Sequence, residues 1–208
     1  MFKYLAPIIL VFFAMIFSAN GVELNQPQQI VETTANQIKQ KLLDKRFATD
    51  FGQLTAYVGH LIDNQTDFEL IASLVLGKLW KQASDLERSS FQAEFRLLLV
   101  RTYARSFMTL KDWSIQYLPN QSQIEDNKAL VRTQLIQAGQ APLKIDYRML
   151  NRGSGWKTYD IIIDGVSIVT NYRTLFKNQA EQTNSLASII QSLQDRNKQA
   201  LAAPAHQD

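Results

Sequence analysis

The order of hydrophobic and polar residues predicts helices in the first half of the chain. Between about residues 27 and 110, apolar residues recur at steps of three and four, which places them on one face of a helix. Pro27 suits the first turn of the first helix. A second, shorter helix is expected over residues 50–62. The apolar stripe of the first helix consists of Val31, Ala35, Ile38 and Leu42.

Two four-residue motifs mark further helix starts. In a capping box, the side chains of the first and fourth residues each bond a free backbone N–H at the helix end. Thr66 and Glu69 have this spacing, and we expect them to open a helix that runs through Leu79. Ser84 and Glu87 repeat the spacing and should open a longer helix. Its apolar face carries Phe91, Phe95, Leu98, Thr102 and Phe107.

From residue 113 to residue 169 the apolar period changes to two, which is typical of antiparallel strands with one polar and one apolar face. Strands are expected at residues 113–118, 131–135, 143–149 and 156–163, with turn residues between the later ones. The sequence therefore predicts an α+β fold with N-terminal helices, a four-stranded antiparallel sheet and C-terminal helices.

Helical spacing returns after the fourth strand. Asp164-Gly165 should end that strand, and residues 166–176 should turn helical. A last helix is expected around the stripe of Leu186, Ile189, Ile190 and Leu193. We expect one domain over residues 22–198 and a flexible tail over residues 199–208.

The N-terminus has the features of a cleaved signal peptide. Lys3 precedes an apolar run from Leu5 to Phe17, which is too short to span a bilayer, and Ala19-Asn20-Gly21 fits a cleavage site. We expect residues 1–21 to be removed, so that the mature chain begins at Val22 in the periplasm. A retained membrane anchor is the alternative.

Composition excludes several kinds of function. The 208 residues contain no cysteine, which excludes disulfide scaffolds, iron–sulfur clusters and thiol catalysis, and only two histidines, so we expect no metal site. A net charge of +3 at pH 7 is too balanced for a dedicated nucleic-acid binder. Arg101 and Arg105 lie one helical turn apart, two turns after Glu94, and we interpret them as a solvated charged face.

No catalytic motif is complete. Ser154 lies between two glycines but joins two strands, with no histidine nearby in the sequence, and His60 has no visible partner. Asp160 and Asp164 flank a buried strand and are the best candidates for an exported hydrolase. The residues alone leave three classes open: a ligand carrier, a hydrolase that uses these aspartates, and a non-lipid interaction module.

Three segments carry a resemblance to a known family. They cover residues 67–83 (DFELIASLVLGKLWKQA), residues 91–104 (FQAEFRLLLVRTYA), and residues 156–160 (WKTYD) followed by 165–173 (GVSIVTNYR). In this order and spacing they resemble the MlaC family of periplasmic toluene-tolerance proteins, over essentially the whole mature chain. Ser73 departs from the pattern, since a basic residue is common there, and so does the polar stretch before Asp67.

The resemblance implies a periplasmic phospholipid shuttle that maintains outer-membrane lipid asymmetry. It implies a curved sheet and helices that enclose a deep apolar pocket for acyl chains, with no covalent step and no cofactor, the glycerophospholipid being cargo. The implied partners are an inner-membrane ABC transporter with an MCE-domain subunit and an outer-membrane lipoprotein–porin complex.

A lipid pocket needs aliphatic and aromatic walls, and the apolar sheet face and neighbouring helices supply candidates. For each of them an ordinary core position is the alternative. The expected lipid-binding residues are Leu70, Leu74, Tyr103, Val131, Leu135, Leu143, Ile145, Tyr147, Met149, Trp156, Tyr159 and Ile161.

Overall fold

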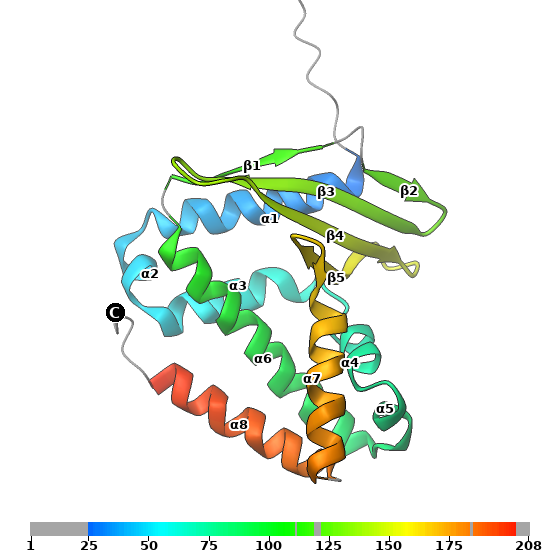
Figure 1. Ribbon diagram of the computed structural model, residues 1–208. Helices are drawn as coiled ribbons and strands as arrows, with labels where there is room; N and C mark the ends of the chain where they lie inside the picture. The colour runs from blue at the N-terminus through cyan, green and yellow to red at the C-terminus, as the bar shows by residue number, and fades with distance from the viewer. Residues whose placement is uncertain (1–24, 111, 119–121, 184, 203–208) are drawn as a thin grey trace, which may run out of the picture.

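The computed structural model of the chain describes residues 25–110, 112–118, 122–183 and 185–202, so the predicted signal peptide lies outside the described residues. The strands form one layer, and the helices lie on one side of it (Figure 1). Helix α1 (Gln26–Leu42) runs along the sheet, and α4 (Phe68–Leu76) and α7 (Ile168–Thr183) contact the sheet at β5 (Trp156–Ile163). Among the described helices, none has both the length and the hydropathy to cross a membrane.

The helices begin at residues whose side chains cap them. Asn25 and Gln28 form a capping box at the start of the first helix, and Ser84 and Glu87 form the capping box that the sequence predicts. The helices are α1 (Gln26–Leu42), α2 (Lys45–Thr49), α3 (Phe51–Asp63), α4 (Phe68–Leu76), α5 (Lys78–Gln82), α6 (Asp85–Thr109), α7 (Ile168–Thr183) and α8 (Leu186–Ala202).

The prediction of a capping box at Thr66 and Glu69 is wrong. Asp67 caps α4 instead, because its carboxylate accepts a hydrogen bond of 3.0 Å from the Leu70 N–H. Thr66 has a different role: it forms a parallel bridge with Thr158 of the sheet. The backbone N–H of Asp67 donates to the Thr158 carbonyl at 2.9 Å, and this long-range pairing shifts the helix start by one residue.

Two helix boundaries also differ from the prediction. The helix expected to run through Leu79 is broken at Gly77, whose φ of 56° and ψ of −110° separate α4 from α5. At the other end of the chain, residues 199–202 are not a flexible tail, because α8 continues to Ala202. Residues 203–208 lie outside the described part.

The four predicted strands are present as part of a six-stranded antiparallel sheet with the order β1-β3-β4-β5-β6, in which β2 also pairs with β3. The two additional strands are short, and β6 occupies positions that we expected to be helical. The strands are β1 (Ser114–Tyr117), β2 (Gln123–Glu125), β3 (Lys128–Ile136), β4 (Leu143–Asn151), β5 (Trp156–Ile163) and β6 (Val166–Ser167).

Buried apolar residues form two separate clusters. The larger one lies among the helices and contains the stacked rings of Phe91 and Phe95, with Phe176 of α7 edge-on to both. The smaller one lies between α1 and the sheet, where Val31 packs against Ala129, Val131 and Met149. The helical layer and the sheet thus each have their own core.

Candidate lipid-binding site

The side of the sheet that faces α1, which we call the inner face, is apolar across three strands. Cross-strand pairing places Val131 of β3 opposite Tyr147 of β4, and Tyr147 opposite Ile161 of β5. Because side chains alternate along a strand, residues paired in this way project from the same face. The further inner-face residues are Thr133, Leu135, Leu143, Ile145, Met149, Trp156, Thr158 and Ile163.

The helices cover the inner face unevenly. Under α1 it is closed, since the side chains of Val131 and Met149 are 1% and 0% exposed. Farther along β4, however, Leu143, Ile145 and Tyr147 remain partly exposed. β4 has a neighbouring strand on each side, so this exposure is not an edge effect. Apolar surface therefore stays accessible on the side of the sheet where a closed core would be expected.

The charged side chains of the same strands lie on the opposite, outer face. Arg132 of β3 and Asp146 of β4 approach to 3.6 Å, and Arg148 of β4 donates to the Asp160 carboxylate of β5 at 3.1 Å. This asymmetry of charge leaves the inner face as the one suited to an apolar ligand.

Tyrosine hydroxyls add a few polar groups to this apolar environment. Burial raises the pKa of Tyr147 to about 12, and burial also raises the pKa values of Tyr117 on β1 and Tyr103 on α6. The nearby charge of Glu32 on α1 raises the pKa of Tyr117 further. Neutral hydroxyls of this kind can contribute hydrogen bonds without placing a charge beside an acyl chain.

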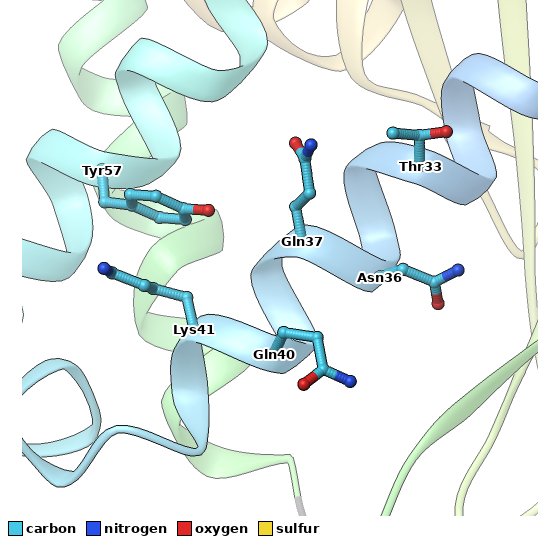
Figure 2. Close-up of a pocket in the computed structure, with 6 residues that line it drawn as sticks. All are labelled: Thr33, Asn36, Gln37, Gln40, Lys41 and Tyr57. Atoms are coloured by element: carbon cyan, nitrogen blue, oxygen red, sulfur yellow. The ribbon is translucent and has the colours of Figure 1, made fainter.

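A separate hollow lies between α1 and α3 and has a volume of about 440 Å³. Figure 2 shows Gln37 and Lys41 of α1 extending beside Tyr57 of α3. Each of the six lining residues ends in an amide, hydroxyl or ammonium group, whereas the inner face of the sheet carries mainly aliphatic and aromatic side chains. The lining residues are Thr33, Asn36, Gln37, Gln40, Lys41 and Tyr57.

The family described as MlaC protein matches residues 32–195. The chain belongs to the MlaC family. The resemblance inferred from the three sequence segments is thereby confirmed.

Two relatives of this MlaC-family chain are informative. It is 28% identical, over 154 residues, to a Haemophilus influenzae protein named intermembrane phospholipid transport system binding protein MlaC; the match covers 67% of this chain and 72% of that protein. It also resembles the solved structure of a phospholipid-binding protein from Ralstonia solanacearum in complex with a phospholipid. That likeness has a TM-score of 0.76 at 26% identity and covers 83% of this chain and 97% of the other.

The MlaC-family fold places the twelve predicted lipid-binding residues in two groups. On the sheet, Val131, Tyr147, Met149 and Trp156 belong to one cluster. Their neighbours on the same face are Leu135, Leu143, Ile145 and Ile161. By contrast, Leu74, Tyr103 and Tyr159 pack against the helical core, and Leu70 is a partly exposed residue of α4.

Sequence reasoning did not select several residues that share this environment. Ile30 and Val31 of α1 and Tyr117 of β1 contact the same cluster as Val131, and Ile163 lies opposite Ile145. Tyr117 could have been found from the alternation of its own short strand. The contribution of α1 could not, because the helical stripe does not say which surface it packs against.

The candidate catalytic aspartates of the MlaC-family chain have structural partners. The Asp160 carboxylate accepts hydrogen bonds from the Ser167 hydroxyl at 2.7 Å and the Val169 N–H at 3.1 Å, and so holds the start of α7 against β5. Asp164 occupies a turn with φ of 46° and accepts from the Lys144 N–H at 3.0 Å. Among the described residues, no group of histidines and acids could hold a metal ion.

Proposed function

We propose that this MlaC-family chain is a periplasmic carrier that moves phospholipids between complexes in the outer and inner membranes and so maintains outer-membrane lipid asymmetry. The observation that carries the proposal is the accessible apolar surface of β4, and of the partly exposed Ile161 and Ile163 on β5, on the face that the helices should bury. The phospholipid bound to the Ralstonia solanacearum relative supports the same cargo.

The energetics of acyl chains explain why such a carrier needs this surface. Burying a methylene group is worth about 0.8 kcal/mol, so about 30 methylenes in two chains amount to about 24 kcal/mol against water. A lipid does not cross an aqueous compartment alone at a useful rate against this cost. The carrier must therefore offer a pocket about as apolar as the membrane and release its cargo on contact with a partner.

This function requires no chemical step, and we propose that the chain is not an enzyme and needs no cofactor. Asp160 and Asp164, the candidates for a hydrolase, are engaged in holding α7 and a turn. Lipid headgroups remain in the aqueous phase while the tails are enclosed, which needs shape and apolarity rather than a reactive group.

Location and partners belong to the same proposal. We propose export through the cleaved N-terminal segment, and delivery to an ABC transporter with an MCE-domain subunit and to an outer-membrane lipoprotein–porin complex. The intact mass of protein recovered from the periplasm should correspond to a chain that begins at Val22, within a few residues. Recovery of the uncleaved chain would contradict export through a cleaved signal.

Lipid analysis of protein purified without detergent tests the cargo. Solvent extraction and mass spectrometry should recover glycerophospholipid, and the delipidated protein should take up lipid from vesicles. Folded protein that is repeatedly lipid-free and cannot load from vesicles would overturn the proposal.

A further inference from the structure

Where α6 packs against α8 and the start of α3, Arg105 and Arg196 lie close enough to Arg101 for their charges to act on it. Arg101 and Arg105 lie one turn apart on α6. Arg196 precedes Asn197 on α8, and the Asn197 side chain accepts a hydrogen bond of 2.7 Å from Nε of Arg101. Figure 1 shows the two helices side by side in this region.

Arg101 is held in place by a buried polar network. Asn197 is only 2% exposed, and its amide Nδ2 donates to the Glu94 backbone carbonyl at 3.0 Å and to the Glu94 carboxylate at 2.7 Å. These bonds fix the orientation of the Asn197 amide, which in turn fixes the Arg101 guanidinium. Among the described residues, Arg101 donates only through Nε, which leaves both terminal nitrogens for another acceptor.

No carboxylate among the described residues forms an ion pair with Arg101, Arg105 or Arg196. The Glu94 carboxylate is bonded to Asn197 instead, and the Arg105 guanidinium lies 4.2 Å from the centre of the Phe51 ring. Burial lowers the pKa of Arg101 most. The charge of Tyr172 opposes this effect, and the repulsion by Arg105 and that by Arg196 each lower the pKa by less.

We propose that Arg101, Arg105 and Arg196 form a binding site for a phosphate group. Guanidinium groups present paired N–H donors that match phosphate oxygens, and an anion would relieve the repulsion that Arg105 and Arg196 exert on Arg101. A phosphate at the surface of an anionic membrane and a free inorganic phosphate share this chemistry. The site is separate from the inner face of the sheet and does not depend on the proposed cargo.

Two measurements on the full mature chain test the site. The first follows the Nε–Hε NMR signal of Arg101 while inorganic phosphate is added, and we expect a saturable shift that chloride at equal ionic strength does not produce. The second measures flotation with vesicles of phosphatidylcholine alone or mixed with phosphatidylglycerol. Here we expect binding only to the mixed vesicles, and competition by inorganic phosphate.

Two double variants that remove the same charge distinguish binding at the site from a general effect of net charge. Arg105→Gln with Arg196→Gln leaves the Arg101 network intact and should weaken binding to mixed vesicles about thirtyfold. Lys78→Gln with Lys128→Gln removes the same charge from exposed positions on α5 and at the start of β3, and should leave it nearly unchanged.

The possible outcomes distinguish the sources of phosphate. A saturable phosphate shift together with selective vesicle binding identifies a membrane phosphate, and a saturable shift without vesicle binding identifies free phosphate. An absent or non-saturable shift, or equal losses in the two double variants, would overturn the site. Binding to an acidic protein surface with neither phosphate response would also overturn it.

Discussion

At the scale of single residues, Asn197 shows how one buried side chain can join two helices. Replacing it with leucine keeps the approximate volume but removes the acceptor for Arg101 and the donor for Glu94. Because hydrogen bonds to charged groups are worth about 1.5–3 kcal/mol, we expect Asn197→Leu to lower the free energy of unfolding by about 2–3 kcal/mol. Urea denaturation measures this loss.

The exposed Asn171 of α7 provides the control. Asn171→Leu should change the free energy of unfolding by no more than about 0.5 kcal/mol, as is usual for surface substitutions. Equal effects of the two replacements would show that the buried network contributes nothing specific.

Tyr147 makes the free energy of unfolding depend on pH in the alkaline range. Its pKa in the fold is about 12, whereas an unfolded tyrosine titrates near 10. Folding therefore favours the neutral hydroxyl. Its contribution to the free energy of unfolding is complete below about pH 10 and is lost as the pH rises towards 12. We expect Tyr147→Phe, which cannot ionise, to lose less stability than the wild type between pH 9 and pH 11.

Urea denaturation at the two pH values provides the measurement. Tyr103 and Tyr172 are present in both proteins, and burial raises their pKa values as well, so they cancel in the comparison. Tyr117 does not cancel fully, because the charge of Tyr147 helps to raise its pKa. Removing that charge reduces the loss at alkaline pH further, in the same direction as the prediction. Identical losses in the wild type and the variant would contradict a buried Tyr147 hydroxyl.

At the scale of elements, local signals were reliable where the element depends on local contacts. The capping box at Ser84 involves residues three apart, and the structure contains it as the sequence predicts. Thr66 has the same local signal, but its backbone pairs with Thr158, which lies far away in the sequence. No local pattern predicts that pairing, and so it could not reveal that Asp67 caps α4.

At Gly77, too, local periodicity gives a wrong prediction, namely a continuous helix through Leu79. The apolar stripe continues across it, but its backbone adopts a left-handed φ that side chains rarely tolerate. A Cβ at Gly77 would also lie 3.3 Å from Nη2 of Arg173 on α7. We expect Gly77→Ala to lower the free energy of unfolding by about 1–3 kcal/mol, measured by urea denaturation.

Gly52, near the start of α3, is the matched control for this prediction. It does not have a positive φ, and a Cβ there makes only ordinary contact with Asp50. Gly52→Ala should raise stability by about 0.5–1 kcal/mol, because alanine favours the helix. A similar loss of stability in both variants would contradict a specific need for glycine at Gly77.

At the scale of the whole molecule, the alternation of apolar residues could identify the inner face but not how much of it is covered. Val131 and Ile145 lie on neighbouring strands of that face with similar sequence patterns. Val131 is closed because Val31 of α1 packs on it, whereas Ile145 remains partly exposed. Coverage depends on where α1 docks, and docking is a property of the folded chain.

Ile145 therefore decides between a lipid pocket and a packed core. In a packed core, the carboxylate of Ile145→Glu would be buried without a partner at a cost of several kcal/mol, and the domain would largely unfold. In an accessible cleft, water reaches the carboxylate and the penalty falls mostly on the lipid. We expect delipidated Ile145→Glu to melt within a few degrees of the wild type and to lose lipid extraction from vesicles.

Ile162→Glu is the matched control, since Ile162 is a partly exposed isoleucine paired with Asp146 on the outer face. It introduces the same charge into the neighbouring strand and should retain lipid extraction. Loss of extraction in both variants would indicate a general effect of charge on the sheet. Collapse of the far-ultraviolet circular dichroism of Ile145→Glu alone would show that Ile145 is ordinary core, and the pocket would then have to lie elsewhere on the inner face.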